Sequence, residues 1–156
     1  MGDANAGAAN VYREVGAVPG ILVGVIDAAK GALAVLIARS ANLSEGWVLI
    51  AGLAVVAGHN WPFFLGFRGG KGVSTTIGVF LAVLTLPSLI IAGPCLITLI
   101  LTRSVDKAMA VFFIGVIGLC WLLGFNSMLI GYSVMLPVII GITHFFRHRL
   151  AARLQP

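Results

Sequence analysis

The sequence predicts an all-α integral membrane protein, because long apolar stretches dominate a chain that carries few charges. Hydrophobic residues make up 60% of the 156 residues and charged residues 10%, and the mean hydropathy is +1.08. Ordinary water-soluble domains carry about 25% charged residues, so this class is excluded. We expect one membrane domain over residues 1–156.

Five apolar stretches define the expected membrane segments. A helix needs about 20 apolar residues to cross a hydrocarbon core about 30 Å thick. One stretch, Val73–Thr102, is longer and is interrupted by Pro87 and by Gly93-Pro94, so it forms either one kinked helix or two short helices that turn near Leu86-Pro87-Ser88. The other four stretches are Val18–Ala38, Trp47–Leu65, Lys107–Leu123 and Ser127–Phe146.

The distribution of Lys and Arg favours two short helices in the long stretch. Basic residues concentrate on the cytoplasmic side of membrane proteins. A helical hairpin puts eight of the ten Lys and Arg residues on one side, whereas one kinked helix would separate Arg103 and Lys107 from Lys71. We therefore predict six transmembrane segments with both termini in the cytoplasm. The cytoplasmic parts are then the loops 1–17, 66–72 and 103–107 and the tail 147–156.

The remaining composition argues against two other classes of protein. The net charge is +5 and the pI is about 9.9, but the basic residues stand at the ends of apolar segments and form no soluble basic face. Nucleic-acid binding is therefore not expected. Cys95 and Cys120 lie inside apolar stretches, where packing is the expected role and neither a disulfide framework nor a metal site is indicated.

The segment from Gly58 to Thr76, GHNWPFFLGFRGGKGVSTT, carries the strongest functional signal. Charged groups at the edge of a bilayer are costly and usually functional. Arg68 and Lys71 supply positive charge, and the glycines at 66, 69, 70 and 72 allow the backbone to approach a ligand closely. The helix expected to begin at Val73 directs backbone N–H groups at the same place, which favours an anion. A phosphate site is predicted.

This glycine-rich segment is not a nucleotide P-loop. That motif requires G-x4-G-K-[ST], but Leu65 stands at the first glycine position and Gly72 follows Lys71.

Three further polar positions have more than one interpretation. Asp27 and Lys30 lie three residues apart in an apolar helix, so they share a face and can pair, either as a structural ion pair or to orient a substrate. His59 is a candidate base, a hydrogen-bond donor to phosphate, or a packing residue. His148, between Arg147 and Arg149, is either part of a solvated basic tail, which we favour, or a catalytic residue.

Together these motifs resemble the acyl-phosphate:glycerol-3-phosphate acyltransferases known as the PlsY family. The segment from Gly58 to Val73 is similar to the family's central motif, GHxxPxFLxFxGGKGVAT, almost residue for residue. Residues 2–13 resemble its first motif, GSGNPGATNVLR, and residues 27–31 its DxxKG element. The C-terminal residues 147–154 weakly resemble HRxNIxRLxxGxE, with Ala151 at the Asn position and without the final GxE. In the first motif, Asp3, Ala4, Ala6 and Ala9 replace serine, glycine, proline and threonine.

The resemblance implies a fold of seven helices, of which this chain is expected to lack the first. It also implies transfer of a fatty acyl group from acyl phosphate to glycerol 3-phosphate, forming lysophosphatidic acid for phospholipid synthesis in the inner membrane of a bacterial cell. Neither a metal nor a cofactor is expected. The oligomeric state is not predicted.

The candidate site residues follow from the motifs and from the two phosphates. His59 and Lys71 are the expected catalytic residues, and Asp27 and Lys30 the structural or orienting pair. One phosphate would be held by the glycine-rich turn and the other by the first motif. The expected substrate-binding residues are Asn5, Asn10, Arg13, Arg68, Gly69, Gly70, Gly72, Ser74 and His148.

Two alternatives of other classes remain at this point. A small anion transporter would also place basic residues and helix N-termini around a passing ion, and it predicts an internal repeat that the sequence does not show clearly. A catalytically impaired relative that binds a lipid or a partner is the other alternative. An acyl-transfer assay separates the three.

We predict that Asp3→Ser raises kcat/KM for glycerol 3-phosphate, because Asp3 brings a carboxylate toward the substrate phosphate. Like charges about 4 Å apart repel by about 4 kcal/mol at an effective dielectric constant of about 20. A third of that repulsion lowers affinity about tenfold. The gain should be largest at low salt, where screening is weak. An unchanged or lower kcat/KM would contradict this, and a lower value would indicate that Asp3 pairs with Arg13 or Lys71 and organises the pocket.

Overall fold

Helices form all the regular structure in the part of the chain that the structure describes. The structure, a computed structural model, describes residues 7–63 and 69–153, with the backbone alone for 146–153. This confirms the predicted all-α fold. The helices are α1 (Ala8–Glu14), α2 (Ala17–Ser40), α3 (Glu45–Asn60), α4 (Val73–Val83), α5 (Thr85–Thr102), α6 (Val105–Leu122) and α7 (Ser127–Arg153).

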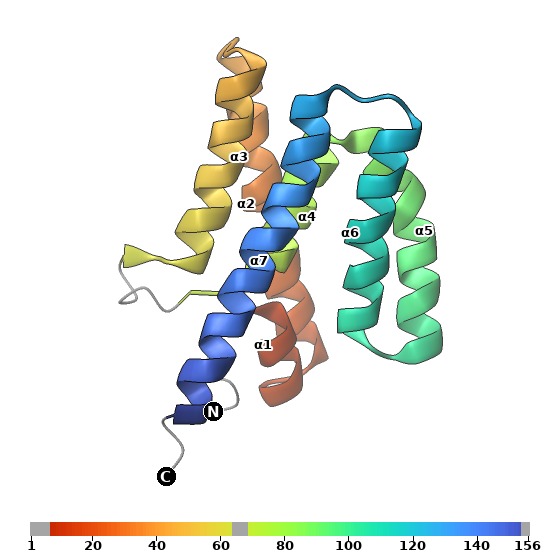
Figure 1. Ribbon diagram of the computed structural model, residues 1–156. Helices are drawn as coiled ribbons and strands as arrows, with labels where there is room; N and C mark the ends of the chain where they lie inside the picture. The colour runs from red at the N-terminus through yellow and green to blue at the C-terminus, as the bar shows by residue number, and fades with distance from the viewer. Residues whose placement is uncertain (1–6, 64–68, 154–156) are drawn as a thin grey trace.

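The long helices run alternately up and down between the two ends of the molecule (Figure 1). The connections from α2 to α3, from α4 to α5 and from α6 to α7 lie at one end, and α1, the α5–α6 connection and the end of α7 lie at the other. The stretch from 73 to 102 is therefore the helical hairpin that the charge distribution predicts, and the single kinked helix is excluded.

The turn of this hairpin lies earlier in the chain than the sequence indicates. Leu84 separates α4 from α5, whereas Pro87 was the expected turn residue. Pro87 instead stands in the first turn of α5, where a helix does not need the N–H group that proline lacks. Ser88, which follows it, is fully buried.

Within the described residues, four helices are long and apolar enough to cross a membrane, namely α2, α5, α6 and the part of α7 up to Phe145. The expected span Trp47–Leu65 corresponds to α3, which has 16 residues and ends at Asn60, where Trp61 and Pro62 follow. Helix α4 has only 11 residues, about 16 Å at about 1.5 Å per residue. Six crossings therefore remain a prediction, with α3 and α4 as the short members.

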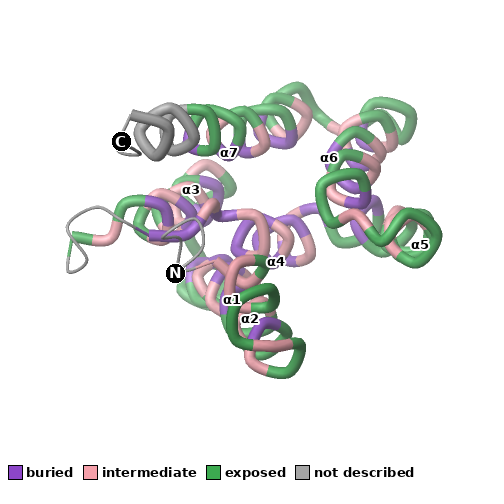
Figure 2. The backbone as a smooth tube through the Cα atoms, turned by 90° about the horizontal axis from the view of Figure 1, so that it is seen from below, coloured by how far each residue is buried: buried purple, intermediate pink, exposed green. Residues whose placement is uncertain are grey.

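Helix α4 occupies the middle of the bundle, with α2, α3, α5 and α7 packed around it (Figure 2). Its packing against α2 depends on two glycines. A Cβ at Gly31 would overlap the carbonyl oxygen of Thr75, and a Cβ at Gly78 would overlap that of Ala28. The two backbones are therefore in direct contact, and only glycine permits this at both positions.

The apolar side chains divide between an interior and an outer surface. The interior combines residues from α2, α3, α4, α6 and α7, among them Val35, Val56, Phe80, Val116 and Leu136, all fully buried. Large apolar side chains also cover the outward faces of the helices, and Leu101 is 78% exposed. Figure 2 shows this outward exposure along most helices. Contiguous apolar surface of this extent fits contact with lipid.

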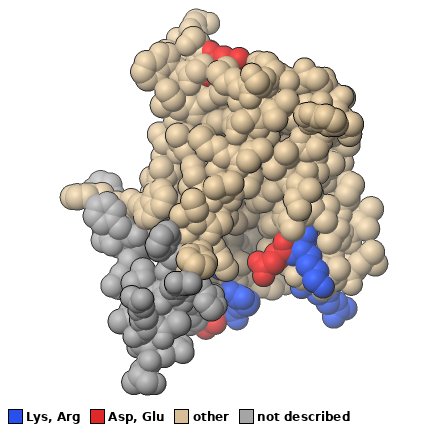
Figure 3. All heavy atoms as spheres, viewed as in Figure 1, with Lys and Arg blue, Asp and Glu red and all other residues tan. Residues whose placement is uncertain are grey.

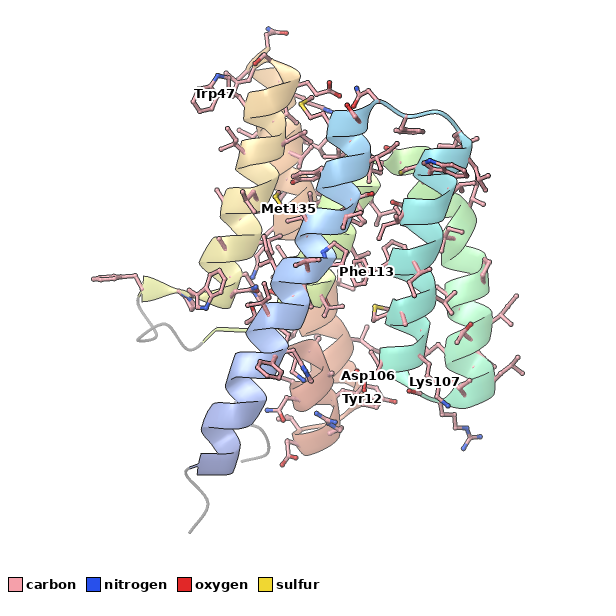
Figure 4. The ribbon with its side chains drawn as sticks, in the orientation of Figure 1. Tyr12, Trp47, Asp106, Lys107, Phe113 and Met135 are labelled. Carbon is pink, nitrogen blue, oxygen red and sulfur yellow. The ribbon has the colours of Figure 1, made fainter. Side chains whose placement is uncertain are left out.

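The two ends of the bundle differ in their side chains. Trp47 lies at one end, and Tyr12, Asp106 and Lys107 lie at the other (Figure 4). On the face drawn in Figure 3, Lys and Arg side chains gather near the end that holds α1 and the α5–α6 connection. At the opposite end, the Arg39 guanidinium donates to the carbonyl oxygen of Ala82 at 2.7 Å and so satisfies the end of α4.

The hairpin arrangement predicts that cysteines placed at Thr85 and at Lys107 are labelled from opposite sides of the membrane. Both positions are exposed and lie at opposite ends of α5 and α6. The measurement is labelling of intact and permeabilised cells by a membrane-impermeant thiol reagent, with Cys95 and Cys120 replaced by alanine. Asn42→Cys, at the same end as Thr85, is the control. Labelling of Thr85→Cys and Lys107→Cys from one side would contradict the hairpin.

Candidate functional site

The glycine-rich turn before α4 packs tightly against the end of α3. The N–H of Gly70 donates to the carbonyl oxygen of His59 at 3.1 Å. A Cβ at Gly69 would overlap the same carbonyl oxygen and Pro62, and a Cβ at Gly70 would overlap the His59 ring at Nε2. The sequence led us to expect these glycines to make room for a ligand; the close approach that the structure shows is to the chain's own helix α3.

Gly72 marks the beginning of α4 and has a different neighbour. Its φ is +83°, a left-handed conformation that favours glycine, and its carbonyl oxygen accepts from the N–H of Thr76 at 2.9 Å. A Cβ at this position would overlap Oδ1 of Asn60. Gly69 and Gly70 therefore pack against His59 and its surroundings, and Gly72 against Asn60.

The side chains of Asp27, Lys30 and His59 form a compact cluster between α2 and α3. The Lys30 ammonium lies 2.5 Å from Oδ1 of Asp27 and 2.5 Å from Nδ1 of His59. Asp27 Oδ1 lies 3.4 Å from the same ring nitrogen. Asp27 is buried and the His59 side chain is 9% exposed. The ion pair of Asp27 and Lys30 that the spacing predicts is therefore present, and the His59 ring lies against it.

The contact with Lys30 favours one tautomer of His59. An ammonium group has only donors, so Nδ1 accepts the hydrogen bond from Lys30, its nearer partner. A neutral imidazole that accepts at Nδ1 has its proton on Nε2. Nε2 is the atom beside Gly70, so the ring presents a donor to the glycine-rich turn.

A cavity of about 240 Å³ opens beside this cluster. It is smaller than the roughly 300–1,000 Å³ of pockets that enclose drug-sized ligands, and its size suits a small polar group. Its wall contains carboxylate, ammonium, imidazole and backbone groups side by side. The residues that line it are Asp27, Lys30, Gly58, His59, Pro62, Gly69 and Gly70.

Other predicted site residues lie near the start of α4 or on α1. Ser74, in the first turn of α4, and Ala8, in the first turn of α1, both approach Gly24 of α2, so the beginnings of α1 and α4 are close together. Lys71 is half-buried and Arg13 is exposed. Among the described residues, the cavity lining does not include Asn10, Arg13, Lys71, Gly72 or Ser74.

Four residues of the sequence analysis are described only in part or not at all. Asn5 and Arg68 lie outside the described residues, as does Asp3, and for His148 the side chain is not described.

Sequence reasoning overlooked Asn60 and Thr143. Asn60 is fully buried and donates through Nδ2 to Oγ1 of Thr143 on α7 at 3.2 Å. The available signal was a polar residue at the end of an apolar helix, next to His59. Its partner is 83 residues away in the sequence, so the pairing itself was not predictable from local pattern.

Comparison with known proteins identifies a matching family and similar sequences. The family model described as "Glycerol-3-phosphate acyltransferase" matches residues 1–154. "Glycerol-3-phosphate acyltransferase 4" of Dehalococcoides mccartyi is 50% identical over 153 residues, covering 96% of this chain and 80% of the relative. A glycerol-3-phosphate acyltransferase of a Synechococcus strain is 38% identical over 148 residues, covering 95% of this chain and 72% of the relative.

Solved structures match the fold over the same extent. The crystal structure of the integral membrane glycerol 3-phosphate acyltransferase PlsY (YgiH) in its glycerol 3-phosphate form gives a TM-score of 0.79 at 31% identity, covering 96% of this chain and 73% of that one. Its lysophosphatidic acid form gives a TM-score of 0.78 and covers 74% of that chain.

We predict that Gly70→Ala abolishes acyl transfer, because the added methyl group would occupy the position beside Nε2 of His59 and displace the ring or the turn. Gly118→Ala in α6 is the matched control, since a Cβ there has no neighbour within 4 Å among the described residues. The measurement is the initial rate of purified protein at equal monodisperse amount. Equal rates for the two variants would show that the contact between Gly70 and His59 is unimportant.

Proposed function

We propose an acyl-phosphate-dependent reaction for this chain, which belongs to the glycerol-3-phosphate acyltransferase family and is a multi-pass membrane enzyme that acylates glycerol 3-phosphate. The comparisons do not favour the transporter or the impaired relative considered above. The observation that carries the proposal is the cavity in which His59 lies between Lys30 and the glycine-rich turn.

The reaction requires alignment of the two substrates and stabilisation of developing charge. A hydroxyl oxygen of glycerol 3-phosphate forms a bond with the acyl carbonyl carbon, the bond from that carbon to the phosphate oxygen breaks, and inorganic phosphate leaves with the hydroxyl proton. An acyl phosphate is already activated, so no covalent serine or cysteine intermediate is needed. The main requirement is to hold two substrates together and to stabilise the negative charge that develops on the carbonyl oxygen.

The Gly69–Gly72 turn and the positive residues around it are proposed to bind phosphate. Lys71, with Arg68 and the backbone N–H groups of the turn, would hold one phosphate, and Asn10 and Arg13 on α1, with Asn5, the other. The proximity of the beginnings of α1 and α4 supports this division, because it places the two groups of residues next to each other. Ser74 and His148 are proposed as further polar contacts.

His59 is proposed to act as a hydrogen-bond donor in the transition state. Its Nε2 proton would stabilise negative charge beside the turn, while the proton of the attacking hydroxyl passes to the substrate phosphate. Asp27 and Lys30 are proposed as positioning residues, because their contacts hold the Nδ1 side of the ring as an acceptor. Removing Lys30 would release Nδ1 and allow the other tautomer.

The proposed location is the inner membrane of a bacterial cell, with the site facing the cytoplasm. The gathering of basic residues at the end that holds α1 and the α5–α6 connection supports this orientation. The residues 1–156 are proposed to form one membrane domain. Glycerol 3-phosphate would enter from the cytoplasm and the acyl donor from the inner leaflet.

The decisive assay offers purified protein two donors, an acyl phosphate and an acyl thioester of equal chain length. Lysophosphatidic acid should form from the acyl phosphate, with release of one phosphate for each product molecule. Product formed only from the thioester would overturn the proposed donor while leaving the acyltransferase assignment intact.

We predict that Lys71→Ala and Arg13→Ala each abolish acyl transfer without unfolding the protein, because each removes a phosphate partner and leaves the apolar spans unchanged. Loss of one charged hydrogen bond to phosphate corresponds to about 1.5–3 kcal/mol, or roughly ten- to hundredfold in affinity. Lys107→Ala is the control, since Lys107 is exposed in the first turn of α6, at the end of the bundle near Tyr12 (Figure 4). Unchanged rates in both site variants would refute the phosphate site.

A further inference from the structure

We propose that Asn60 is a positioning residue that ties the glycine-rich turn at the start of α4 to α7. The inference rests on the proposed function, because the turn that Asn60 positions is the one proposed to bind substrate phosphate. It goes further by naming the link that holds this turn and a helix at the far end of the sequence, α7, in one arrangement.

Asn60 forms a buried polar link between α3 and α7. It is the last residue of α3 and is fully buried. Thr143 is also buried, with 2% of its surface exposed. A buried amide without hydrogen bonds would be destabilising by about 1–3 kcal/mol. Here Nδ2 of Asn60 donates to Oγ1 of Thr143 at 3.2 Å, so α3 and α7 are joined by a polar contact in an apolar interior.

The hydrogen bonds of Thr143 fix the orientation of the Asn60 amide. The Thr143 hydroxyl has one proton, and it donates this proton to the carbonyl oxygen of Ile139 at 2.8 Å. The hydroxyl can then only accept from Asn60, so the NH2 group must face Thr143. The carbonyl Oδ1 consequently faces away from Thr143, and it contacts the Cα side of Gly72.

This orientation places the turn. Gly72 stands between Lys71 and the first residue of α4, has its left-handed φ of +83°, and has no room for a side chain because Oδ1 of Asn60 occupies that space. A displacement of Asn60 therefore changes where Gly72 can lie, and Lys71 moves with it through one peptide bond. Thr143, Asn60 and Gly72 form a continuous contact from α7 to the proposed phosphate site.

Two nearly isosteric substitutions test the link. Asn60→Leu removes the hydrogen bond to Thr143 and the amide oxygen that packs against Gly72, and Thr143→Val removes the acceptor while keeping the shape. We expect each to raise, by about ten- to hundredfold, the KM for the substrate whose phosphate the turn binds, since a displacement of about 1 Å at a site can lower its efficiency to this extent. Thr143→Ser, which keeps the hydroxyl, should have a KM close to that of the wild type.

A purely structural role predicts a different outcome. It would lower the melting temperature and the fraction of active protein, but each active molecule would keep its KM. Ser133→Ala serves as the control for this case, since the buried Ser133 of α7 donates to Ile130 of its own helix. The double variant Asn60→Leu with Thr143→Val should have the same KM as either single variant, because both changes break one link.

The substitution Lys71→Arg separates failure of this inference from failure of the proposed function. It keeps the charge but moves it, so it should raise the KM of the same substrate. If Lys71→Arg raises a KM and the Asn60 and Thr143 variants raise none, the link is refuted and the phosphate site stands. If Lys71→Arg changes neither KM, the phosphate-binding turn and the inference built on it both fail.

Discussion

Direct contact between the backbones of α2 and α4 is the constraint on which the rest of the structure depends. Gly31 and Gly78 lie at this contact. A Cβ added at either position would overlap a carbonyl group of the opposite helix. Lys30 precedes Gly31 and Asp27 lies one turn before it, so the same contact that buries α4 also brings the ion pair to the end of α3. A bulkier residue at either glycine would separate the cavity wall from the turn that completes it.

The sequence was sufficient for those features that depend on local composition. Apolar length predicted the helices, charge distribution predicted the hairpin over 73–102, and the spacing of Asp27 and Lys30 predicted their pairing, all of which the structure shows. The hairpin turn was misplaced because Pro87 is compatible with the first turn of a helix, so proline marks a boundary only to within a few residues.

Features that depend on tertiary contact were less accessible. Glycine in a sequence indicates that no side chain fits, but it does not say what occupies the space; at Gly70 and Gly72 the occupants are His59 and Asn60. The contact of Lys30 with His59 joins residues 29 apart, and that of Asn60 with Thr143 joins residues 83 apart. The central motif nonetheless predicted the location of the cavity, because five of its residues line it, namely Gly58, His59, Pro62, Gly69 and Gly70.

The short length of α4 has a consequence for how two dissimilar substrates meet. Its 11 residues span about 16 Å, roughly half of a hydrocarbon core about 30 Å thick. One end of α4 must therefore lie below the level of the lipid headgroups, with its far carbonyl satisfied by Arg39 and its sides shielded by neighbouring helices. Glycerol 3-phosphate could thus reach the start of α4 along protein surface, while the alkyl chain of the acyl donor remains in the lipid leaflet. Under the proposed function, the two substrates would then meet at a depth that both can reach.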